Sequence, residues 1–247
     1  MSENTNNLAP IPQSSTHPAT NYEQVGRGHE EPSDLEDMEV PRAKLIQFTS
    51  EEAQATDPDE RRNPGSIINS ITKEELGKLF IPIFNSISFT KWNPRKKDDP
   101  NYDPAFEPGE LIFSTTDRKD SRIKDGLKFG PNGEAPVVIK SMNFLCHFIG
   151  HHYPLILSFA KSSSKAGSRL NTMTKISGGD MFSFRYKLNI SLKDNAGTKY
   201  FILDTLPNGR ATPDEFKLAE HWWNEFRGKL IKIHEDEKSA ATPEFSE

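Results

Sequence analysis

The sequence has very little cysteine, with Cys146 alone among 247 residues. A single cysteine excludes an intramolecular disulfide and any zinc module built from several cysteines, which fits a reducing compartment. No stretch approaches the run of about 18 apolar residues that a membrane-spanning helix needs. The N-terminus, MSENTNNLAP, lacks the basic and apolar blocks of a signal peptide. We therefore expect a cytoplasmic protein.

Signatures of common enzyme classes are also missing. The sequence contains no GxxxxGK(S/T) phosphate loop, no GxGxxG dinucleotide motif, no GxSxG nucleophile elbow and no HExxH or deaminase zinc motif. Asp117 and Asp120 near Lys119 and Lys124 resemble a nuclease centre, but a polar loop produces such a combination by chance. We therefore predict a protein that is not an enzyme and has no cofactor.

One cluster contains residue types that bind metals. Cys146, His147, His151 and His152 are four potential donors within seven residues. Adjacent residues on a strand face opposite sides, so Cys146 and His147 cannot both bind one ion without distortion. We favour a buried thiol beside a polar strand end over a metal site.

Charge is distributed unevenly along the chain. Residues 1–40 hold one basic and eight acidic residues, and the last fourteen residues hold one basic and five acidic ones. Residues 140–200 hold nine basic residues against only Asp180 and Asp194. A basic middle between acidic ends predicts an anionic partner.

Composition divides the chain into one domain and two arms. Residues 1–38 are rich in Asn, Pro, Ser, Thr and acidic residues without a periodic apolar pattern, so we expect a disordered acidic arm. Residues 235–247 are polar and acidic and are expected to form a mobile tail. Residues 39–234 have the size of one domain.

Apolar periodicity predicts several strands in this domain. A period of two from Leu79 to Phe89 predicts a half-buried strand that ends near Trp92. Strict alternation predicts a strand over residues 181–192, and a turn leads to a returning strand over residues 198–203. Shorter signals predict an extended segment at 40–48, a polar loop at 51–65, and strands at 111–113, 137–149 and 155–159.

Two principal helices are expected. Residues 162–176 combine a Ser cap with near-helical apolar spacing, and Thr212 caps a second helix with Pro213 at its first position. Trp222 and Trp223 lie on the apolar stripe of the second helix and are expected in its core. The predicted fold is α+β, an OB-like antiparallel β-barrel with two principal helices and disordered acidic termini.

The basic segment also carries aromatic residues, which is a pattern typical of nucleic-acid binding. Proteins that hold single strands without sequence preference bind the phosphates in a positive groove and stack the bases on aromatic side chains. The predicted nucleic-acid-binding residues are Trp92, Lys161, Lys165, Arg169, Lys175, Arg185, Lys187, Lys199 and Tyr200, with Lys193 beside the last two.

The aromatic part of this pattern has two interpretations. An alternating strand normally buries its apolar side, so Phe182 and Tyr186 are expected in the core rather than under bases. Arg185 and Lys187 then form the binding face, and stacking needs another residue. Trp92 is a candidate, because three basic residues follow it within five positions.

The acidic ends suggest protein partners. A mobile acidic tail can occupy the chain's own cationic groove and bind replication or recombination proteins when DNA displaces it. The alternative function is a protein–protein adaptor that binds host or phage replication or transcription machinery through its acidic arms.

Several segments, taken in order, resemble a known set of proteins. The segments VPRAKLIQ, PGSIINSITKEELG, YPLILSFAKSSSKAGSRLNTM and FSFRYKLNIS are similar to tailed-phage proteins, some of them described as single-stranded DNA-binding, over residues 39–230. The resemblance implies a non-catalytic single-stranded DNA-binding protein of phage replication or recombination in the host cytoplasm. Many members carry a cysteine-rich insertion like a zinc knuckle where this chain has Ser114, Thr115 and Thr116, so no metal site is implied.

Overall fold

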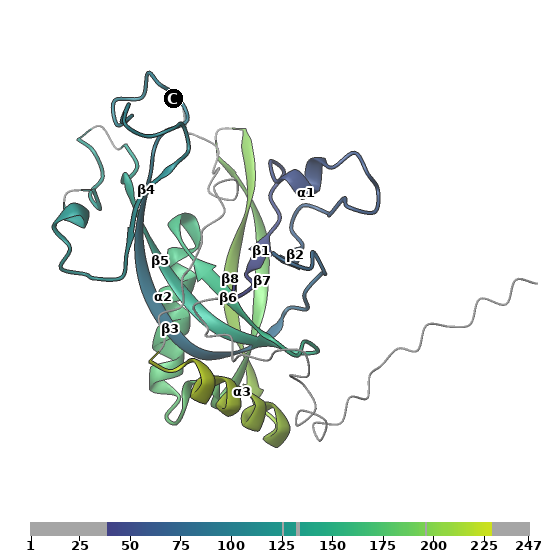
Figure 1. Cartoon of the computed structure of the whole chain (residues 1–247). Coiled ribbons are helices and arrows are strands. Elements are labelled where there is room, and N and C mark those ends of the chain that lie inside the picture. Colours follow the sequence, from purple (N-terminus) through teal and green to yellow (C-terminus); the bar gives the residue numbers. More distant parts are fainter. Residues whose placement is uncertain (1–38, 125, 132–133, 196, 229–247) are drawn as a thin grey trace, which may run out of the picture. The chain divides into compact units, whose positions relative to one another are not determined.

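The structure is a computed structural model that describes residues 39–228 except 125, 132–133 and 196 (Figure 1). The expected disordered arm at 1–38 and mobile tail at 235–247 lie outside the described residues, as do the last residues of the expected domain, 229–234. None of the described helices is long and apolar enough to cross a membrane.

The expected strands and both principal helices are present, with shifted ends. The strands are β1 (Ala43–Leu45), β2 (Ile67–Asn69), β3 (Leu79–Trp92), β4 (Leu111–Thr115), β5 (Val138–Phe148), β6 (Pro154–Phe159), β7 (Phe184–Asn195) and β8 (Thr198–Arg210). The helices are α1 (Glu51–Gln54), α2 (Ser164–Ile176) and α3 (Pro213–Phe226), with 3-10 turns η3 (Ser121–Ile123), η4 (Lys161–Ser163) and η5 (Met181–Ser183). β2 and the single-turn helix α1 were not expected.

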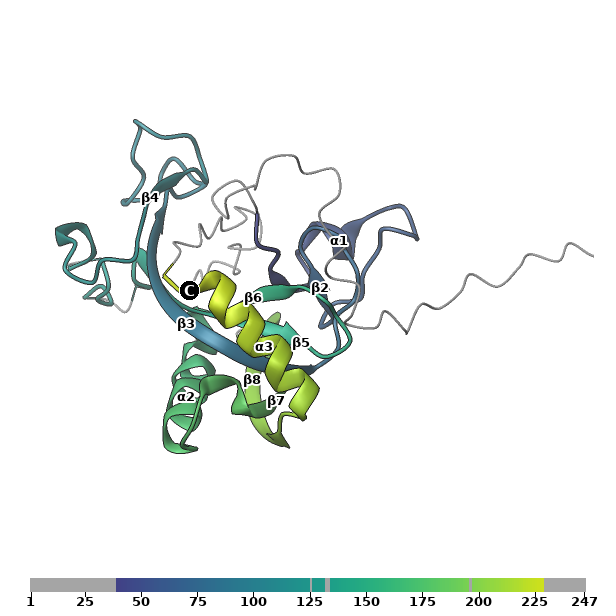
Figure 2. The same ribbon diagram turned by 60° about the horizontal axis from the view of Figure 1, so that its bottom comes forward.

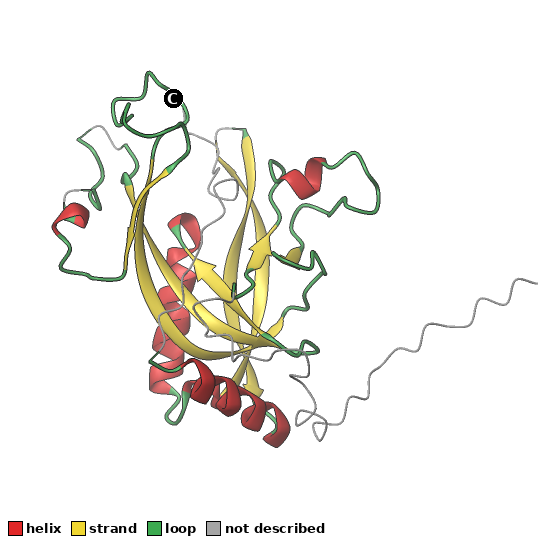
Figure 3. Ribbon diagram, in the orientation of Figure 1, coloured by secondary structure: helices red, strands yellow, loops and turns green. Residues whose placement is uncertain are grey.

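The strands form two antiparallel sheets (Figure 3). The larger sheet has the order β6-β5-β3-β7-β8, and β4 pairs with the far end of β3; the smaller sheet contains β1 and β2. The α+β class and the mostly antiparallel sheet are confirmed. The predicted closed barrel is wrong, because among the described residues no strand ladder joins β6 to β8 and both sheets are open.

Isolated contacts take the place of a strand ladder between the outer strands β6 and β8. The Gln47 side-chain amide donates to the main-chain oxygen of Phe201 on β8 at 2.9 Å and accepts from its N–H at 2.8 Å. On the β6 side, one bridge joins Arg42 to Ile156. β1 is only three residues long and pairs with β2, so it cannot continue the larger sheet into a barrel.

The main hydrophobic core joins the larger sheet to β2 and α2. It contains Phe144 and Phe148 of β5, Leu157 of β6 and Leu188 of β7, all essentially without exposure, and Leu170 of α2 packs into it. α3 packs against β3 and η5 and begins with a capping box, in which the Thr212 hydroxyl accepts from the N–H of Glu215. Figure 2 shows α2 and α3 as separate helices beside the curved strand β3.

The start of β7 differs from the expected alternation. The predicted strand began at residue 181, but residues 181–183 form η5, and the register shifts between Phe184 and Tyr186. Phe182 therefore leaves the row of core residues on β7. Its ring instead packs against Phe216 of α3, with ring centroids 4.8 Å apart.

Gly167 lets α2 lie close to the sheet, and this contact gives a first prediction. A Cβ at this position would lie 2.7 Å from the Cβ of Phe159 and 3.0 Å from the methyl carbon of Met142. Overpacking typically costs about 1–3 kcal/mol, and the better helix propensity of alanine offsets about 1 kcal/mol. We expect Gly167→Ala to lower the free energy of unfolding by about 1 kcal/mol in chemical denaturation.

Gly77→Ala is the matched control for this variant. A Cβ at Gly77 would meet nothing nearer than the Ile149 carbonyl oxygen at 3.9 Å. This control should unfold at the same denaturant concentration as the wild type or above it. Equal stability of the two variants would contradict close packing of α2 on β6.

Candidate nucleic-acid interface

α2 carries three of the predicted binding residues on its exposed side. Lys165, Arg169 and Lys175 are exposed, whereas the opposite side of the helix is buried in the core. Lys165 and Arg169 are four residues apart and therefore neighbours on one helix face. Lys161 is exposed at the start of η4, which leads into α2.

The β7–β8 hairpin carries the second group on its outer face. Its register places Lys187 opposite Leu206, Asn189 opposite Asp204, and Lys193 opposite Tyr200. Successive side chains of a strand point to opposite faces, so these residues share one face while Tyr186 and Leu188 point into the core. Lys187 and Lys193 are exposed, and Tyr200 is half-buried.

Two contacts bring α2 and this hairpin together. The Ser163 hydroxyl, just before α2, accepts a hydrogen bond from the N–H of Leu203 on β8 at 3.0 Å. Six residues further along, an Nη atom of Arg169 lies 2.8–2.9 Å from both carboxylate oxygens of Asp204. Asp204 lies on the outer hairpin face, so the exposed side of α2 continues onto that face.

Not all of the predicted cations belong to one unpaired group. Asp204 forms an ion pair with Arg169, and Lys199 stands opposite Asp194 in the hairpin register, on the face opposite to Lys187 and Lys193. Arg185 is half-buried; it donates to the main-chain oxygen of Arg210 at 3.0 Å and lies 3.5 Å from a carboxylate oxygen of Glu215 on α3. Arg185 therefore joins β7 to the start of α3.

Four predicted cations have no such partner. Among the described residues, no hydrogen bond or ion pair reaches the side chains of four exposed lysines, two on α2 and two on β7. We call these lysines, together with Arg169 and Tyr200, the basic surface: Lys165, Arg169, Lys175, Lys187, Lys193 and Tyr200.

Trp92 lies away from the basic surface. β3 pairs with β7 at Leu79 and Phe80, whereas Trp92 ends the same strand twelve residues further on, beside β4. At a rise of about 3.3 Å per residue, this separation is about 40 Å along the strand. Trp92 is also half-buried, and its indole nitrogen is buried without a partner among the described residues.

The loop after Trp92 does not form a positive groove. Residues 93–110 hold three basic and five acidic residues. The buried Asn93 organises this loop, because its amide donates to the main-chain oxygens of Asp103, Phe106 and Glu107 at 2.9–3.1 Å. The sequence pattern predicted Trp92 in the binding site, but the structure does not bring it to the other candidates.

The aromatic residues around the start of β7 have a core role. Phe182 and Tyr186 are 4% and 2% exposed, so neither can stack on a base without unfolding. This supports the core interpretation of these rings. Tyr200 is the aromatic residue that the hairpin places beside the exposed lysines.

The candidate metal donors are separated by the sheet. Cys146 lies in the main core, where burial raises the pKa of its thiol, and His147 lies on the other face of β5. His151 is 3.7 Å from a carboxylate oxygen of Glu74. Within the described part of the chain, no three His, Cys, Asp or Glu residues are grouped so that they could hold a metal ion.

Among the described histidines, His147 is the one whose pKa is clearly shifted. It is 4% exposed, and its Nδ1 atom has no hydrogen-bond partner among the described residues. Removal from water lowers the pKa of its imidazole from 6.5 to about 4, which the nearby Glu215 carboxylate only partly opposes. The ring is therefore neutral at pH 7.

The acidic residues that resembled a nuclease centre are used in local structure. The Asp120 carboxylate accepts from Nε and the main-chain N–H of Arg122, and these bonds lower its pKa to about 2. Asp117 accepts from the main-chain N–H of Lys119 at 2.9 Å. Each carboxylate therefore stabilises a turn.

No sequence pattern singled out Asp204 or Ser163, which join the two halves of the basic surface. Counting the hairpin register outward from the turn at residues 195–198 would have placed Asp204 opposite Asn189. No local pattern indicates that the Ser163 hydroxyl binds Leu203, because the two residues are 40 positions apart.

A family model matches most of the chain. The model describes a Pam3 phage gp34-like protein, and the match extends over residues 11–232. Searches of curated proteins and of solved structures found no match. The match agrees with the phage part of the resemblance seen in the sequence. The chain belongs to the Pam3 phage gp34-like protein family.

Proposed function

We propose that this phage protein binds single-stranded DNA without catalysis, on the basic surface. The observation that supports the proposal is the group of four exposed lysines, two on α2 and two on β7, that carry no ion pair among the described residues. Such unpaired cations on α2 and on the β7–β8 hairpin, which the Arg169–Asp204 pair joins to α2, offer several phosphate contacts at once.

The geometry supports backbone binding more than base recognition. The lysines bind phosphates as point charges and carry no sequence information. Tyr200 stands opposite Lys193, so one base can stack on Tyr200 while an adjacent phosphate contacts the lysine. We therefore expect binding with little sequence preference, as a protein that covers single strands in phage replication or recombination requires.

The test is a fluorescence-anisotropy titration of the full chain with labelled single-stranded and duplex oligonucleotides at several salt concentrations. Each phosphate contact to a single strand contributes about −0.7 to the slope of log K against log salt, so four contacts predict a slope of about −3. Single-stranded DNA should bind more tightly than the duplex. Absent or salt-independent binding would contradict the proposal and leave the adaptor hypothesis ahead.

A further inference from the structure

β3 has one edge that is only partly covered. On this edge it pairs with β7 at Leu79 and Phe80 and with β4 from Phe89 onward. No described strand pairs with residues 81–88 on this side, although β5 pairs with β3 along the other edge. Because main-chain groups alternate between the two edges, Asn85 and Ile87 present N–H and C=O groups that a further strand can bind.

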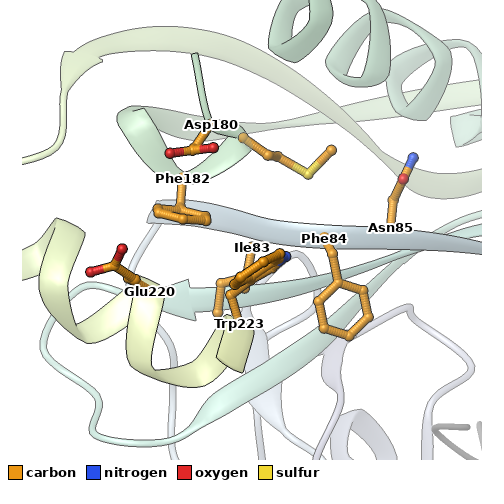
Figure 4. Close-up of a pocket in the computed structure, with 8 residues that line it drawn as sticks. Ile83, Phe84, Asn85, Asp180, Phe182, Glu220 and Trp223 are labelled. Carbon is orange, nitrogen blue, oxygen red and sulfur yellow. The ribbon is translucent and has the colours of Figure 1, made fainter. Parts of the chain in front are cut away.

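A cavity of about 320 Å³ lies at this uncovered edge (Figure 4). Phe84 and Asn85 of β3 form one wall, Asp180 and Phe182 lie at η5, and Glu220 and Trp223 come from α3. In the view of Figure 4, the carboxylates of Asp180 and Glu220 lie on either side of the Phe182 ring. The cavity therefore combines aromatic walls with two acidic groups.

The charges in the cavity are not balanced by the described part of the chain. Asp180 and Glu220 are exposed, and no described side chain forms a hydrogen bond or ion pair with either carboxylate. No basic residue belongs to the cavity lining. An occupant with a positive charge and an apolar stem fits this lining, because the carboxylates attract the charge and the rings pack against the stem.

A neighbouring contact shows that a guanidinium suits these rings. The guanidinium carbon of Arg227 lies 4.7 Å from the centroid of the Trp223 ring. A planar guanidinium stacks on an aromatic face and also matches the geometry of a carboxylate, which an ammonium does less well. The expected occupant is therefore an arginine side chain.

We propose that the uncovered edge of β3 binds an extended, basic segment of a partner protein, which adds a strand at Asn85 and Ile87 and inserts an arginine side chain between Asp180 and Glu220. Main-chain pairing provides affinity in this mode of binding, and the side-chain pocket provides specificity. The chain's own terminal segments do not fit this description, because residues 1–40 and the last fourteen residues are both strongly acidic.

The experiment uses the full-length protein and a fluorescein-labelled nine-residue peptide of alternating Val and Thr with one central Arg. A second peptide carries citrulline, a neutral isostere, instead of Arg. A third peptide carries N-methyl groups on alternate residues, which removes the main-chain N–H donors along one edge of the extended peptide. We expect the citrulline and N-methyl peptides to bind at least 10-fold more weakly than the Arg peptide. Agmatine, which has the guanidinium and no peptide backbone, should not displace the Arg peptide when the two are present at the same concentration.

Protein variants locate the binding site. The double variant Asp180→Asn with Glu220→Gln should bind the Arg peptide at least 10-fold more weakly, with a melting temperature close to the wild type because neither carboxylate makes a described contact. The control Asp214→Asn with Glu225→Gln removes the same charge from exposed positions on α3 and should bind normally.

Four outcomes would overturn this proposal. Equal binding of the Arg and citrulline peptides would exclude charge recognition, and equal loss in both double variants would show only long-range electrostatics. Displacement by agmatine at equal concentration would indicate a small-cation site without strand addition. A dimer that forms with rising protein concentration and is lost in the Asp180–Glu220 variant would make a second copy the occupant. None of these outcomes depends on DNA binding by the basic surface.

Discussion

Acidification from pH 7 to pH 4.5 is expected to lower the free energy of unfolding by about 2.5 kcal/mol through His147 alone. The folded protein holds the pKa of this imidazole at about 4, against 6.5 in an unfolded chain. Between these two values the unfolded state binds a proton that the folded state does not bind. The contribution of the neutral His147 ring to the free energy of unfolding is therefore fully present above pH 6.5 and is lost as the pH falls towards 4.

Two carboxyl groups with lowered pKa values affect a lower pH range. The pKa of Glu52 is lowered from 4.5, chiefly by hydrogen bonds that outweigh its burial, and the pKa of Asp120 is lowered from 3.8 to about 2. Both groups lose their stabilising contribution below pH 4.5. The window from pH 6.5 to 4.5 therefore reports on His147.

The measurement is chemical denaturation at pH 7.0, 5.5 and 4.5 for the wild type and His147→Leu, which removes the titrating group and keeps an apolar side chain of similar volume. The variant should lose about 2.5 kcal/mol less than the wild type over this range. His221→Gln, which replaces an exposed histidine on α3, is the matched control. An unchanged pH dependence in His147→Leu would show that this ring is accessible to protons in the folded state.

The strands could be predicted because their apolar residues alternate or cluster, and local spacing is sufficient to show this. β3 was predicted over its whole length, since its apolar positions keep a period of two almost to Trp92. β8 was predicted to end at residue 203, because the residues from Leu206 onward are exposed and show no apolar pattern. In the structure the strand continues to Arg210. Pairing with β7, which is a long-range feature, extends the strand.

The sheet closure could not be predicted from local pattern. The OB-like barrel followed from the number of strands, yet the edges of β6 and β8 are joined by side chains such as Gln47, 154 residues from its partner Phe201. A second example is the row in which Asn143 donates to Ser88 at 2.9 Å and accepts from Ser158 at 2.7 Å. Asn143 and Ser88 can be buried because the three polar side chains satisfy one another across three strands.

The candidate site was predicted only in part, because local periodicity shows which residues face outward but not which distant residues pair with them. Helix and strand periodicity identified Lys165, Arg169 and Lys187 as outward-facing residues, and the structure places them so. Arg185 also alternates outward on β7, but Glu215 at the start of α3 pairs with it. That pairing depends on how α3 packs, which periodicity within one strand does not reveal.

Replacing Lys165, Lys175, Lys187 and Lys193 together by Gln is expected to remove most of the affinity for single-stranded DNA at low salt. Four phosphate contacts make the wild type lose about 50-fold in affinity between 50 and 200 mM salt, because the release of the same counterions into a more concentrated solution gains less entropy. The quadruple variant should show a slope of log K against log salt near zero. Its stability should be close to that of the wild type, since all four side chains are exposed.

The matched control replaces four exposed lysines outside the basic surface by Gln: Lys97, Lys119, Lys124 and Lys217. Both variants lose four positive charges, so a general effect of net charge would weaken them equally, whereas a local surface weakens only the first. The control should keep a slope of about −3 and an affinity within about 3-fold of the wild type at 50 mM salt. If both variants lose affinity equally, the lysines of α2 and β7 do not form the binding site. If neither variant does, DNA binds to other cations, and Arg169 and Arg185 would have to leave their carboxylate partners to take part.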